Sequence, residues 1–274
     1  MKPTFLFIGP DKSGSTWIYE ILKQHPQCFV PVVKDIYFFD RYYEKGTSWY
    51  EKFFEKAPKD SIAAGELSHD YLYSAQAAAR IIKHYPDIRL MTSLRDPVER
   101  TFSHYLYLVR SGLTQAPFED ALEEFDELIE NSLYYKYLKE YINIFPASQI
   151  KVLWFEQLQA DPRAYAREIF DYLGISWTED IDFEENVLRA GKPRVKALGW
   201  AAKQGANLFR DLGLPKIVGK IKHSRITQAL YKPYSGKEKP VIKPESEQKL
   251  KKIFHEDILQ LQDLLNKNLS HWLD

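Results

Sequence analysis

The hydrophobic pattern of the chain alternates between short apolar runs and longer segments in which apolar residues recur at helical spacing. The short runs predict strands at 4–9, 62–66, 89–94 and 151–155. The longer segments predict helices at 16–24, 74–84, 97–111, 117–130, 132–144 and 162–173. Strands separated by helices indicate parallel strand–helix–strand units with right-handed crossovers. We therefore expect an α/β fold in three layers, in which helices flank a central parallel sheet.

The C-terminal part of the chain shows a different pattern. Residues 181–244 are rich in Lys, Arg, Gly and Pro and are weakly periodic, which predicts loops and short helices. A last amphipathic helix begins at Pro244, with the apolar spacing of a helix that packs on a core. Its apolar positions are Leu250, Ile253, Phe254, Ile258, Leu261, Leu264 and Leu265. We expect residues 1–274 to form a single domain, since this length is enough for one large α/β core.

The composition is that of an ordinary globular protein, with 45% hydrophobic and 28% charged residues. The 38 basic and 38 acidic residues balance, so no overall field attracts nucleic acid or an anionic membrane. Cys28 is the single cysteine, which excludes an internal disulfide and gives no support to a cysteine metal site. The sequence shows no signal peptide and no apolar run near the roughly 20 residues that span a bilayer. We expect a cytoplasmic protein without a membrane span.

The most informative motif links the first predicted strand to the first predicted helix. It reads Gly9-Pro10-Asp11-Lys12-Ser13-Gly14-Ser15-Thr16-Trp17. The backbone N–H groups of a small-residue loop and of a helix N-terminus bind anions, and a lysine adds a positive charge. The motif therefore predicts a phosphate-binding loop, although Lys12 precedes Gly14, whereas the lysine of a Walker motif follows the last glycine. The alternative is a plain strand-to-helix turn whose small residues permit close packing.

A second motif follows the predicted strand 89–94. It reads Arg95-Asp96-Pro97-Val98-Glu99-Arg100-Thr101-Phe102-Ser103. Arg95 stands at the carboxyl end of the strand, where open α/β sheets bind ligands, and Ser103 lies in the helix that follows. A guanidinium fork and a hydroxyl can hold one phosphate group together. The alternative is that Arg95 is a paired surface ion and that Ser103 is incidental.

Together the two motifs resemble those of sulfotransferases that use 3′-phosphoadenosine 5′-phosphosulfate (PAPS). The first is similar to their 5′-phosphosulfate loop and the second to their 3′-phosphate motif. The resemblance implies a P-loop-NTPase-like sulfotransferase fold, PAPS as the sulfuryl donor and 3′,5′-ADP as the product. It implies donor contacts from Lys12, Ser13, Gly14, Ser15, Thr16, Trp17, Arg95 and Ser103.

Two further segments resemble the acceptor side of heparan-type and bacterial sulfotransferases. Lys34-Asp35-Ile36-Tyr37-Phe38-Phe39 is similar to their Lys-Glu-x-x-Phe-Phe, which implies Asp35 as the base, and Gly46-x-x-Trp49-Tyr50 follows as it does there. The segment that begins at Glu66 carries Leu67 where relatives have a lysine, so the role of that lysine cannot be carried over. Two residues later, His69 has the ordinary pKa of a better base at pH 7, and we place it level with Asp35. The alternative for His69 is a structural histidine.

A basic loop near residues 186–196 is similar to a family loop that closes over the nucleotide phosphates. The resemblance implies Lys192 and Arg194 as the matching residues, and the alternative is a solvated basic loop.

The mechanism implied by the resemblance transfers a sulfuryl group to a hydroxyl, or less readily an amine, of a carbohydrate or small-molecule acceptor. Lys12 would neutralise developing charge, and Asp35 or His69 would remove the acceptor proton. We expect no metal requirement, because a sulfuryl group carries less charge than a phosphoryl group. A P-loop-type kinase and a non-catalytic nucleotide-binding relative are the alternatives. The kinase leaves the missing Gly-Lys-Ser/Thr and the Arg95 motif unexplained.

Overall fold

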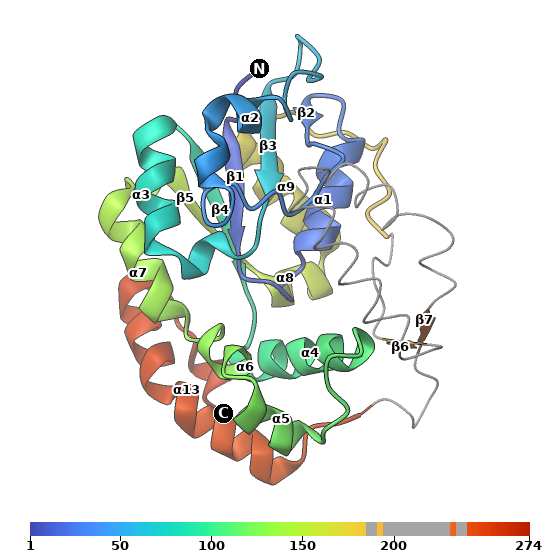
Figure 1. The fold of residues 1–274 in the computed structure, drawn as a ribbon, viewed down its shortest axis with the longest axis vertical. Helices are drawn as coiled ribbons and strands as arrows, with labels where there is room; N and C mark the ends of the chain where they lie inside the picture. Colours follow the sequence, from blue (N-terminus) through green and yellow to red (C-terminus); the bar gives the residue numbers. More distant parts are fainter. Residues whose placement is uncertain (185–190, 194–230, 234–239) are drawn as a thin grey trace. The chain divides into compact units, whose positions relative to one another are not determined.

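A computed structural model describes residues 1–184, 191–193, 231–233 and 240–274 (Figure 1). The chain divides into two compact units. The first, here called the sheet unit, consists of Met1–Arg95 and Tyr134–Val187. The second, here called the helical unit, consists of Asp96–Leu133 and Leu188–Asp274. The single domain expected from the chain length stays a prediction.

The sheet unit is built on five parallel strands in the order β2-β3-β1-β4-β5. Their bounds are β1 Phe5–Gly9, β2 Cys28–Phe29, β3 Ala63–Leu67, β4 Arg89–Leu94 and β5 Ile150–Trp154. The four predicted strands are confirmed within one residue at each end. The strand β2 escaped prediction because two residues give no readable pattern. The central strand β1 is buried along its whole length, as its unbroken apolar run requires.

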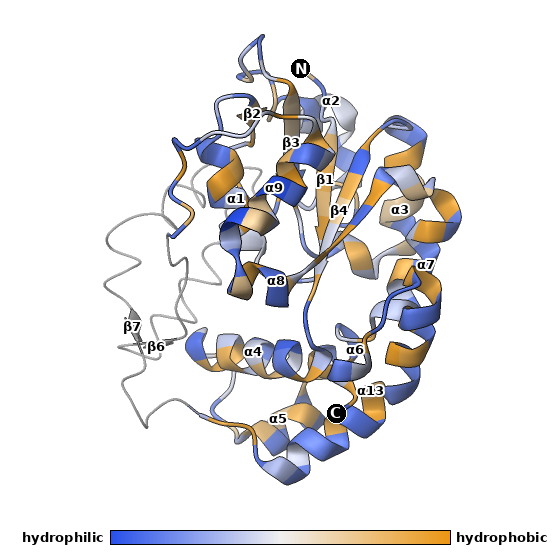
Figure 2. Cartoon of the chain, turned by 180° about the vertical axis from the view of Figure 1, so that it is seen from behind, coloured by the Kyte–Doolittle hydropathy of each residue, from blue (hydrophilic) through white to orange (hydrophobic). Residues whose placement is uncertain are grey.

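Helices cover both faces of this sheet, as the three-layer prediction requires (Figures 1 and 2). Their bounds are α1 Ser15–Gln24, α2 Thr47–Glu51, α3 Ala75–His84, α7 Tyr134–Ile144, α8 Phe155–Ala160 and α9 Pro162–Leu173, with short 3-10 turns at Tyr43–Lys45, Tyr71–Tyr73 and Ala147–Gln149. Phe5 and Phe7 share one core cluster with α1 and α9. Leu6 and Ile8 alternate to the opposite face, where α3 and α7 pack against each other.

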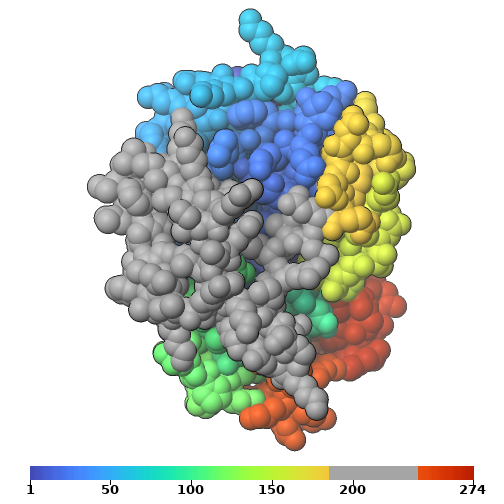
Figure 3. Space-filling model, turned by 90° about the vertical axis from the view of Figure 1, so that its right-hand side faces the viewer, coloured from blue at the N-terminus to red at the C-terminus, as the bar shows by residue number. Residues whose placement is uncertain are grey.

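The segment after α9 returns to α1. The backbone N–H of Asp182 donates to Gln24 Oε1 at 3.1 Å, and the indole N–H of Trp17 donates to the carbonyl of Phe183 at 3.3 Å. Figure 3 shows the two segments side by side on the surface, in blue and yellow. This return closes one edge of the core cluster over α1.

The helical unit contains four helices among its described residues, with a short antiparallel strand pair. Their bounds are α4 Pro97–Arg110, α5 Phe118–Glu124, α6 Glu127–Glu130, α13 Pro244–Leu265, β6 Gly191–Pro193 and β7 Tyr231–Pro233, followed by a 3-10 turn at Ser270–Trp272. The predicted stripe on α13 is confirmed for Leu250, Phe254, Ile258 and Leu261, whereas Ile253 is exposed. Most of the loops predicted at 181–244 lie outside the described residues. No helix in the described ranges is long and apolar enough to cross a membrane.

The prediction of one helix over 117–130 is wrong, because the helix is interrupted at Phe125. Phe125 adopts an extended conformation between α5 and α6. The break lets α6 turn, so that the carbonyl of Leu128 accepts a hydrogen bond of 2.9 Å from Thr101 Oγ1 in α4. Residues 118–130 contain no Gly or Pro that would have marked the break in the sequence.

Arg100 is the residue that joins α4 to α6 most extensively. Its side chain is fully buried, and Nη1 donates to the carbonyls of Glu127 and Leu128 and to Ser132 Oγ. Its Nη2 lies 3.0 Å from His104 Nδ1. A buried guanidinium with this many partners is a structural element of the unit.

We predict that Arg100→Met lowers the free energy of unfolding by about 2–4 kcal/mol, because it removes the hydrogen bonds that the buried guanidinium makes to α6 and to Ser132. Urea denaturation measures the loss. Arg163→Met is the matched control, since Arg163 makes an exposed ion pair with Glu179, and its unfolding midpoint should hardly move. Equal losses in the two variants would contradict the structural role of Arg100.

Candidate active site

The loop between β1 and α1 has the geometry of an anion-binding turn. Lys12 and Gly14 both adopt left-handed conformations, with φ of 66° and 88°. Gly14 is the N-cap of α1 and has no side chain to cap this end, so within the described part of the chain the N–H groups of the first helical turn keep their capacity for a ligand. Ser13 is fully buried, and its Oγ has no hydrogen-bond partner within the described part of the chain. This donor set fits an anion better than it fits a plain turn.

Two glycines permit the close packing around this loop. A Cβ at Gly14 would lie 2.9 Å from Leu158 Cδ2 in α8, in addition to the strain of its positive φ. A Cβ at Gly9 would lie 2.2 Å from the carbonyl oxygen of His69. The end of β1 therefore packs directly on the backbone of His69, beside the start of the loop.

Arg95 contacts the same loop. Its Nη1 donates to the carbonyl of Lys12 at 3.4 Å, and its guanidinium lies 4.6 Å from the centre of the Phe155 ring. The Tyr134 hydroxyl donates to the carbonyl of Arg95 at 2.8 Å and fixes the backbone there. These contacts favour a role at the loop over that of a surface ion.

The structure does not test three other predicted contacts to the sulfuryl donor, those of Ser103, Lys192 and Arg194. Ser103 lies within α4 of the helical unit, so its pairing with Arg95 stays a prediction. Lys192 lies in β6, and its side chain is outside the described part of the chain. Arg194 lies outside the described residues altogether.

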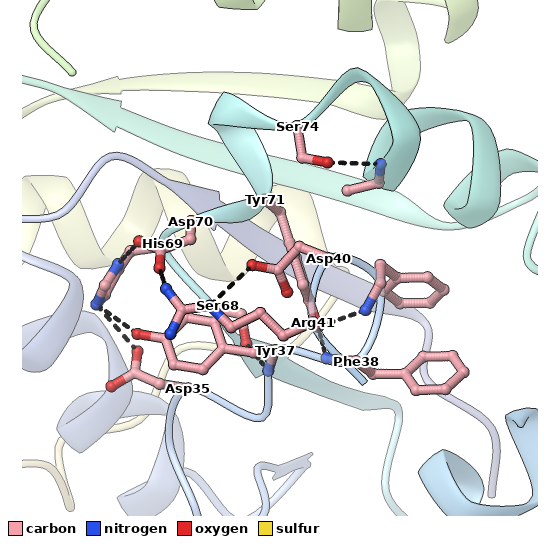
Figure 4. Close-up of polar contacts among 12 residues, drawn as sticks. Asp35, Tyr37, Phe38, Asp40, Arg41, Ser68, His69, Asp70, Tyr71 and Ser74 are labelled. Atoms are coloured by element: carbon pink, nitrogen blue, oxygen red, sulfur yellow. Dashed lines mark hydrogen bonds and ion pairs between the residues drawn. The ribbon is translucent and has the colours of Figure 1, made fainter. Parts of the chain in front are cut away.

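The two candidate bases meet in the sheet unit (Figure 4). Asp35 is buried, and its backbone N–H donates to the carbonyl of Leu67 at 2.9 Å, which ties its loop to the end of β3. One carboxylate oxygen, Oδ1, lies 2.9 Å from Lys34 Nζ and 3.6 Å from His69 Nε2. Residues 34 positions apart in the sequence therefore form one charged cluster.

Three more side chains surround the His69 imidazole. Its Nδ1 lies 2.6 Å from Asp70 Oδ1, and its Nε2 lies 3.0 Å from the Tyr37 hydroxyl. Arg41 is ion-paired with Asp70, and its guanidinium stacks 4.2 Å from the centre of the Tyr37 ring. Sequence reasoning missed Tyr37, Arg41 and Asp70, because no local pattern indicates that these side chains meet.

The pKa of His69 is set by opposing effects. Burial lowers it, whereas the negative charges of Asp35 and Asp70 and the hydrogen bond to Asp70 raise it. Lys34 also lowers it. The balance leaves the pKa of His69 above its ordinary value.

Glu66 organises the segment that carries these residues. Its carboxylate accepts hydrogen bonds from Ser68 Oγ at 2.6 Å and from the Tyr71 hydroxyl at 2.5 Å. Ser68 Oγ and the Tyr71 hydroxyl in turn accept the backbone N–H groups of Tyr37 and Phe38. Burial raises the pKa of Glu66 to about 7, although the hydrogen bonds from Ser68 and Tyr71 act in the opposite direction. One buried carboxyl thus fixes the loop that carries Asp35 and Tyr37 to the segment at the end of β3.

Within the described ranges, no group of three or more His, Cys, Asp or Glu side chains is arranged to hold a metal ion. The expectation that no metal is required stays a prediction.

Comparison with known proteins identifies the family. The model of the sulfotransferase domain matches residues 2–262. The chain therefore belongs to the sulfotransferase family, as its two phosphate motifs predicted.

Several sulfotransferases are similar in sequence. Mouse heparan sulfate glucosamine 3-O-sulfotransferase 3B1 is 30% identical over 182 residues, which are 63% of this chain and 46% of that protein. Human heparan sulfate glucosamine 3-O-sulfotransferase 6 is 29% identical over 237 residues, which are 83% of this chain and 66% of that protein. The membrane-associated sulfotransferase kil1 of Dictyostelium discoideum is 32% identical over 139 residues, 48% of this chain and 30% of that protein. The chain thus spans about half the length of the first of these relatives.

Solved structures confirm the fold class. A sulfotransferase from Alicyclobacillus acidocaldarius aligns over 100% of both chains with a TM-score of 0.74 and 22% identity. Mouse sulfotransferase SULT7A1, solved in complex with PAP, aligns over 94% of this chain and 85% of its own, with a TM-score of 0.53 and 13% identity. The α/β fold with a central parallel sheet flanked by helices is therefore the sulfotransferase fold.

We predict that Glu66 makes the stability of the protein depend on pH. Its pKa rises from 4.5 to about 7 on folding, so between these values the folded state binds a proton that the unfolded state has lost. The stability from this group is fully present below pH 4.5 and is lost as the pH rises through about 7. Relative to Glu66→Gln, the wild type should lose up to about 3 kcal/mol between pH 5 and pH 8, at about 1.4 kcal/mol for each unit of pKa shift.

Urea denaturation at several pH values measures this difference, and Glu44→Gln at an exposed position is the control. Parallel pH profiles for the wild type and Glu66→Gln would show that Glu66 does not take up a proton on folding.

Proposed function

We propose that the protein transfers a sulfuryl group from PAPS to a hydroxyl of a carbohydrate or small-molecule acceptor, with an amine as the less favoured alternative. The observation that carries this proposal is the packing of Gly9 on the backbone of His69. It brings an anion-binding loop and a candidate base to the same edge of the sheet. Membership of the sulfotransferase family supports the reaction class. The relatives named as heparan sulfate 3-O-sulfotransferases support a carbohydrate acceptor.

The proposed donor site is the loop between β1 and α1. The N–H groups at the start of α1, the buried hydroxyl of Ser13 and the ammonium of Lys12 would hold the 5′-phosphosulfate. Lys12 would also neutralise the charge that builds on the oxygen bridging sulfur and phosphorus as this bond breaks. Arg95 would hold the 3′-phosphate. Ser103, Lys192 and Arg194 remain proposed donor contacts on the family resemblance.

The proposed base is His69, with Asp35 in a supporting role. The side chain of His69 is 23% exposed, whereas that of Asp35 is 4% exposed and already paired with Lys34. The hydroxyl of Tyr37 lies 3.0 Å from Nε2, and an acceptor hydroxyl would replace it as the hydrogen-bond donor to this nitrogen. Asp35, 3.6 Å from Nε2, would stabilise the imidazolium that forms.

A ligand titration tests the proposal against its two rivals. 3′,5′-ADP or PAPS should raise the melting temperature, whereas ATP with Mg²⁺ should have little effect. The opposite preference would contradict a PAPS site and favour a kinase. Transfer from ³⁵S-labelled PAPS to a panel of oligosaccharides, phenols and alcohols then tests turnover. Binding of PAPS with no transfer to any acceptor would favour the non-catalytic relative.

We predict that Lys12→Ala lowers turnover by about 10²-fold or more, because its charge acts mainly in the transition state. The ³⁵S transfer assay measures the loss, and circular dichroism checks the fold. Lys23→Ala, at a half-exposed lysine that pairs with Glu20 at the other end of α1, is the matched control and should keep full activity. Near-normal turnover in Lys12→Ala would exclude the proposed role.

We predict that Arg95→Ala weakens binding of 3′,5′-ADP by roughly 1.5–3 kcal/mol, the range for a charge-assisted hydrogen bond. Binding of AMP, which lacks the 3′-phosphate, should change far less. Isothermal titration measures both affinities. Equal losses for the two nucleotides would mean that Arg95 acts through its bond to the carbonyl of Lys12 and does not recognise the 3′-phosphate.

A further inference from the structure

Four side chains of the sheet unit form a closed ring that includes the imidazole of His69 (Figure 4). His69 Nδ1 contacts Asp70, and Asp70 is ion-paired with Arg41. The guanidinium of Arg41 stacks on the ring of Tyr37, and the hydroxyl of Tyr37 returns to His69 Nε2. Each nitrogen of the imidazole therefore has a defined partner.

The chemistry of these partners fixes the tautomer of neutral His69. An ionised carboxylate can only accept a hydrogen bond, so at 2.6 Å from Asp70 Oδ1 the Nδ1 atom must carry the hydrogen. Nε2 is then the unprotonated nitrogen, and it accepts a hydrogen bond from the Tyr37 hydroxyl. Arg41 and His69 keep Asp70 ionised, since together they lower its pKa although burial raises it.

We infer that Asp70 is a positioning residue for sulfuryl transfer, which holds His69 with its hydrogen on Nδ1 so that the unprotonated Nε2 can take the acceptor's proton when the acceptor hydroxyl replaces that of Tyr37 as its hydrogen-bond donor. The inference rests on the proposed function, in which His69 is the base. The acceptor's proton passes to Nε2 while its oxygen bonds to sulfur. The bond from sulfur to the 5′-phosphate oxygen breaks, and 3′,5′-ADP leaves with that electron pair. Asp70 stays unprotonated throughout and stabilises the imidazolium.

The charged and titratable groups around His69 come from three segments. Asp35, Lys34 and Tyr37 face it from the loop after β2, and Asp70 follows it in the chain. Arg41 and Asp11 act on Asp70. Replacing Asp70 by Asn removes one negative charge from this set and offers an amide N–H₂ to Nδ1. The loss of the negative charge lowers the pKa of His69. The amide donor favours the tautomer with its hydrogen on Nε2, which cannot take the acceptor's proton at that nitrogen.

The test is a ¹H–¹⁵N NMR titration of the histidine side chains in the wild-type chain and in Asp70→Asn, with His69→Ala to assign the signal. We expect the neutral wild-type imidazole to carry its hydrogen on Nδ1. In Asp70→Asn the hydrogen should move to Nε2 and the pKa of His69 should fall by about one unit. His84→Ala, which removes a histidine paired with Tyr43 outside the ring, should leave the His69 signal unchanged.

Kinetics and a second variant complete the test. Asp70→Asn should lower kcat by about 10²-fold and leave KM for PAPS within about threefold, with partial rescue by Asp70→Glu. Arg41→Met removes a half-exposed positive charge, so it should move the pKa of His69 upward, opposite to Asp70→Asn. Opposite shifts of the His69 pKa in the two variants would not result from a general loss of fold, so they distinguish positioning from misfolding. Arg41→Met provides the test if Asp70→Asn does not fold.

A wild-type imidazole with its hydrogen on Nε2, or an unchanged tautomer and pKa in Asp70→Asn, would overturn the inference about Asp70. The NMR result needs no acceptor. A wild-type protein that transfers no sulfuryl group from PAPS would instead overturn the proposed function, so the two failures are distinguishable.

Discussion

The parallel pairing of β1 with β3 is the constraint on which the site depends. In this register Phe7 lies beside Leu67, and the backbone N–H of Ser68 donates to the carbonyl of Phe7 at 3.1 Å. Beyond the paired residues, Gly9 packs on the carbonyl of His69 at a distance that no side chain would permit. The candidate phosphate loop and the candidate base therefore follow the ends of adjacent strands, at the edge where open α/β sheets bind ligands.

The loop that carries Asp35 and Tyr37 contains strained and buried residues, and hydrogen bonds to neighbouring segments offset the cost of that strain. Asp35 and Tyr37 have positive φ values of 65° and 56°, a conformation that costs on the order of 1–3 kcal/mol for a residue with a side chain. Their backbone N–H groups are held by the carbonyl of Leu67 and by Ser68 Oγ. Ser68 is held in turn by the buried carboxyl of Glu66. Strain at this loop therefore coincides with the charged cluster around His69, as expected where chemistry requires a fixed geometry.

The sequence predicted the elements with a strong local signal and missed those that depend on tertiary contacts. The apolar run of β1 and the Asp96-Pro97 start of α4 were read correctly, because burial and helix capping act on neighbouring residues. The break at Phe125 depends on contacts between α6 and α4, so no local signal marked it. The loop between β1 and α1 was assigned as a candidate phosphate loop from its small residues and lysine, and this assignment stays a prediction. The ring of Tyr37, Arg41 and Asp70 was not predicted, because it depends on the hydrogen bonds that tie the loop after β2 to the segment at the end of β3.

A crystal structure of the chain with 3′,5′-ADP tests the central claim most directly. The account predicts that the 5′-phosphate lies within hydrogen-bond distance of the N–H groups at the start of α1, of Ser13 Oγ and of Lys12 Nζ. It also predicts that His69 Nε2 is turned toward the same phosphate group. A nucleotide bound elsewhere, or one that leaves the Ser13 hydroxyl unpaired, would contradict the assignment of this loop as the donor site.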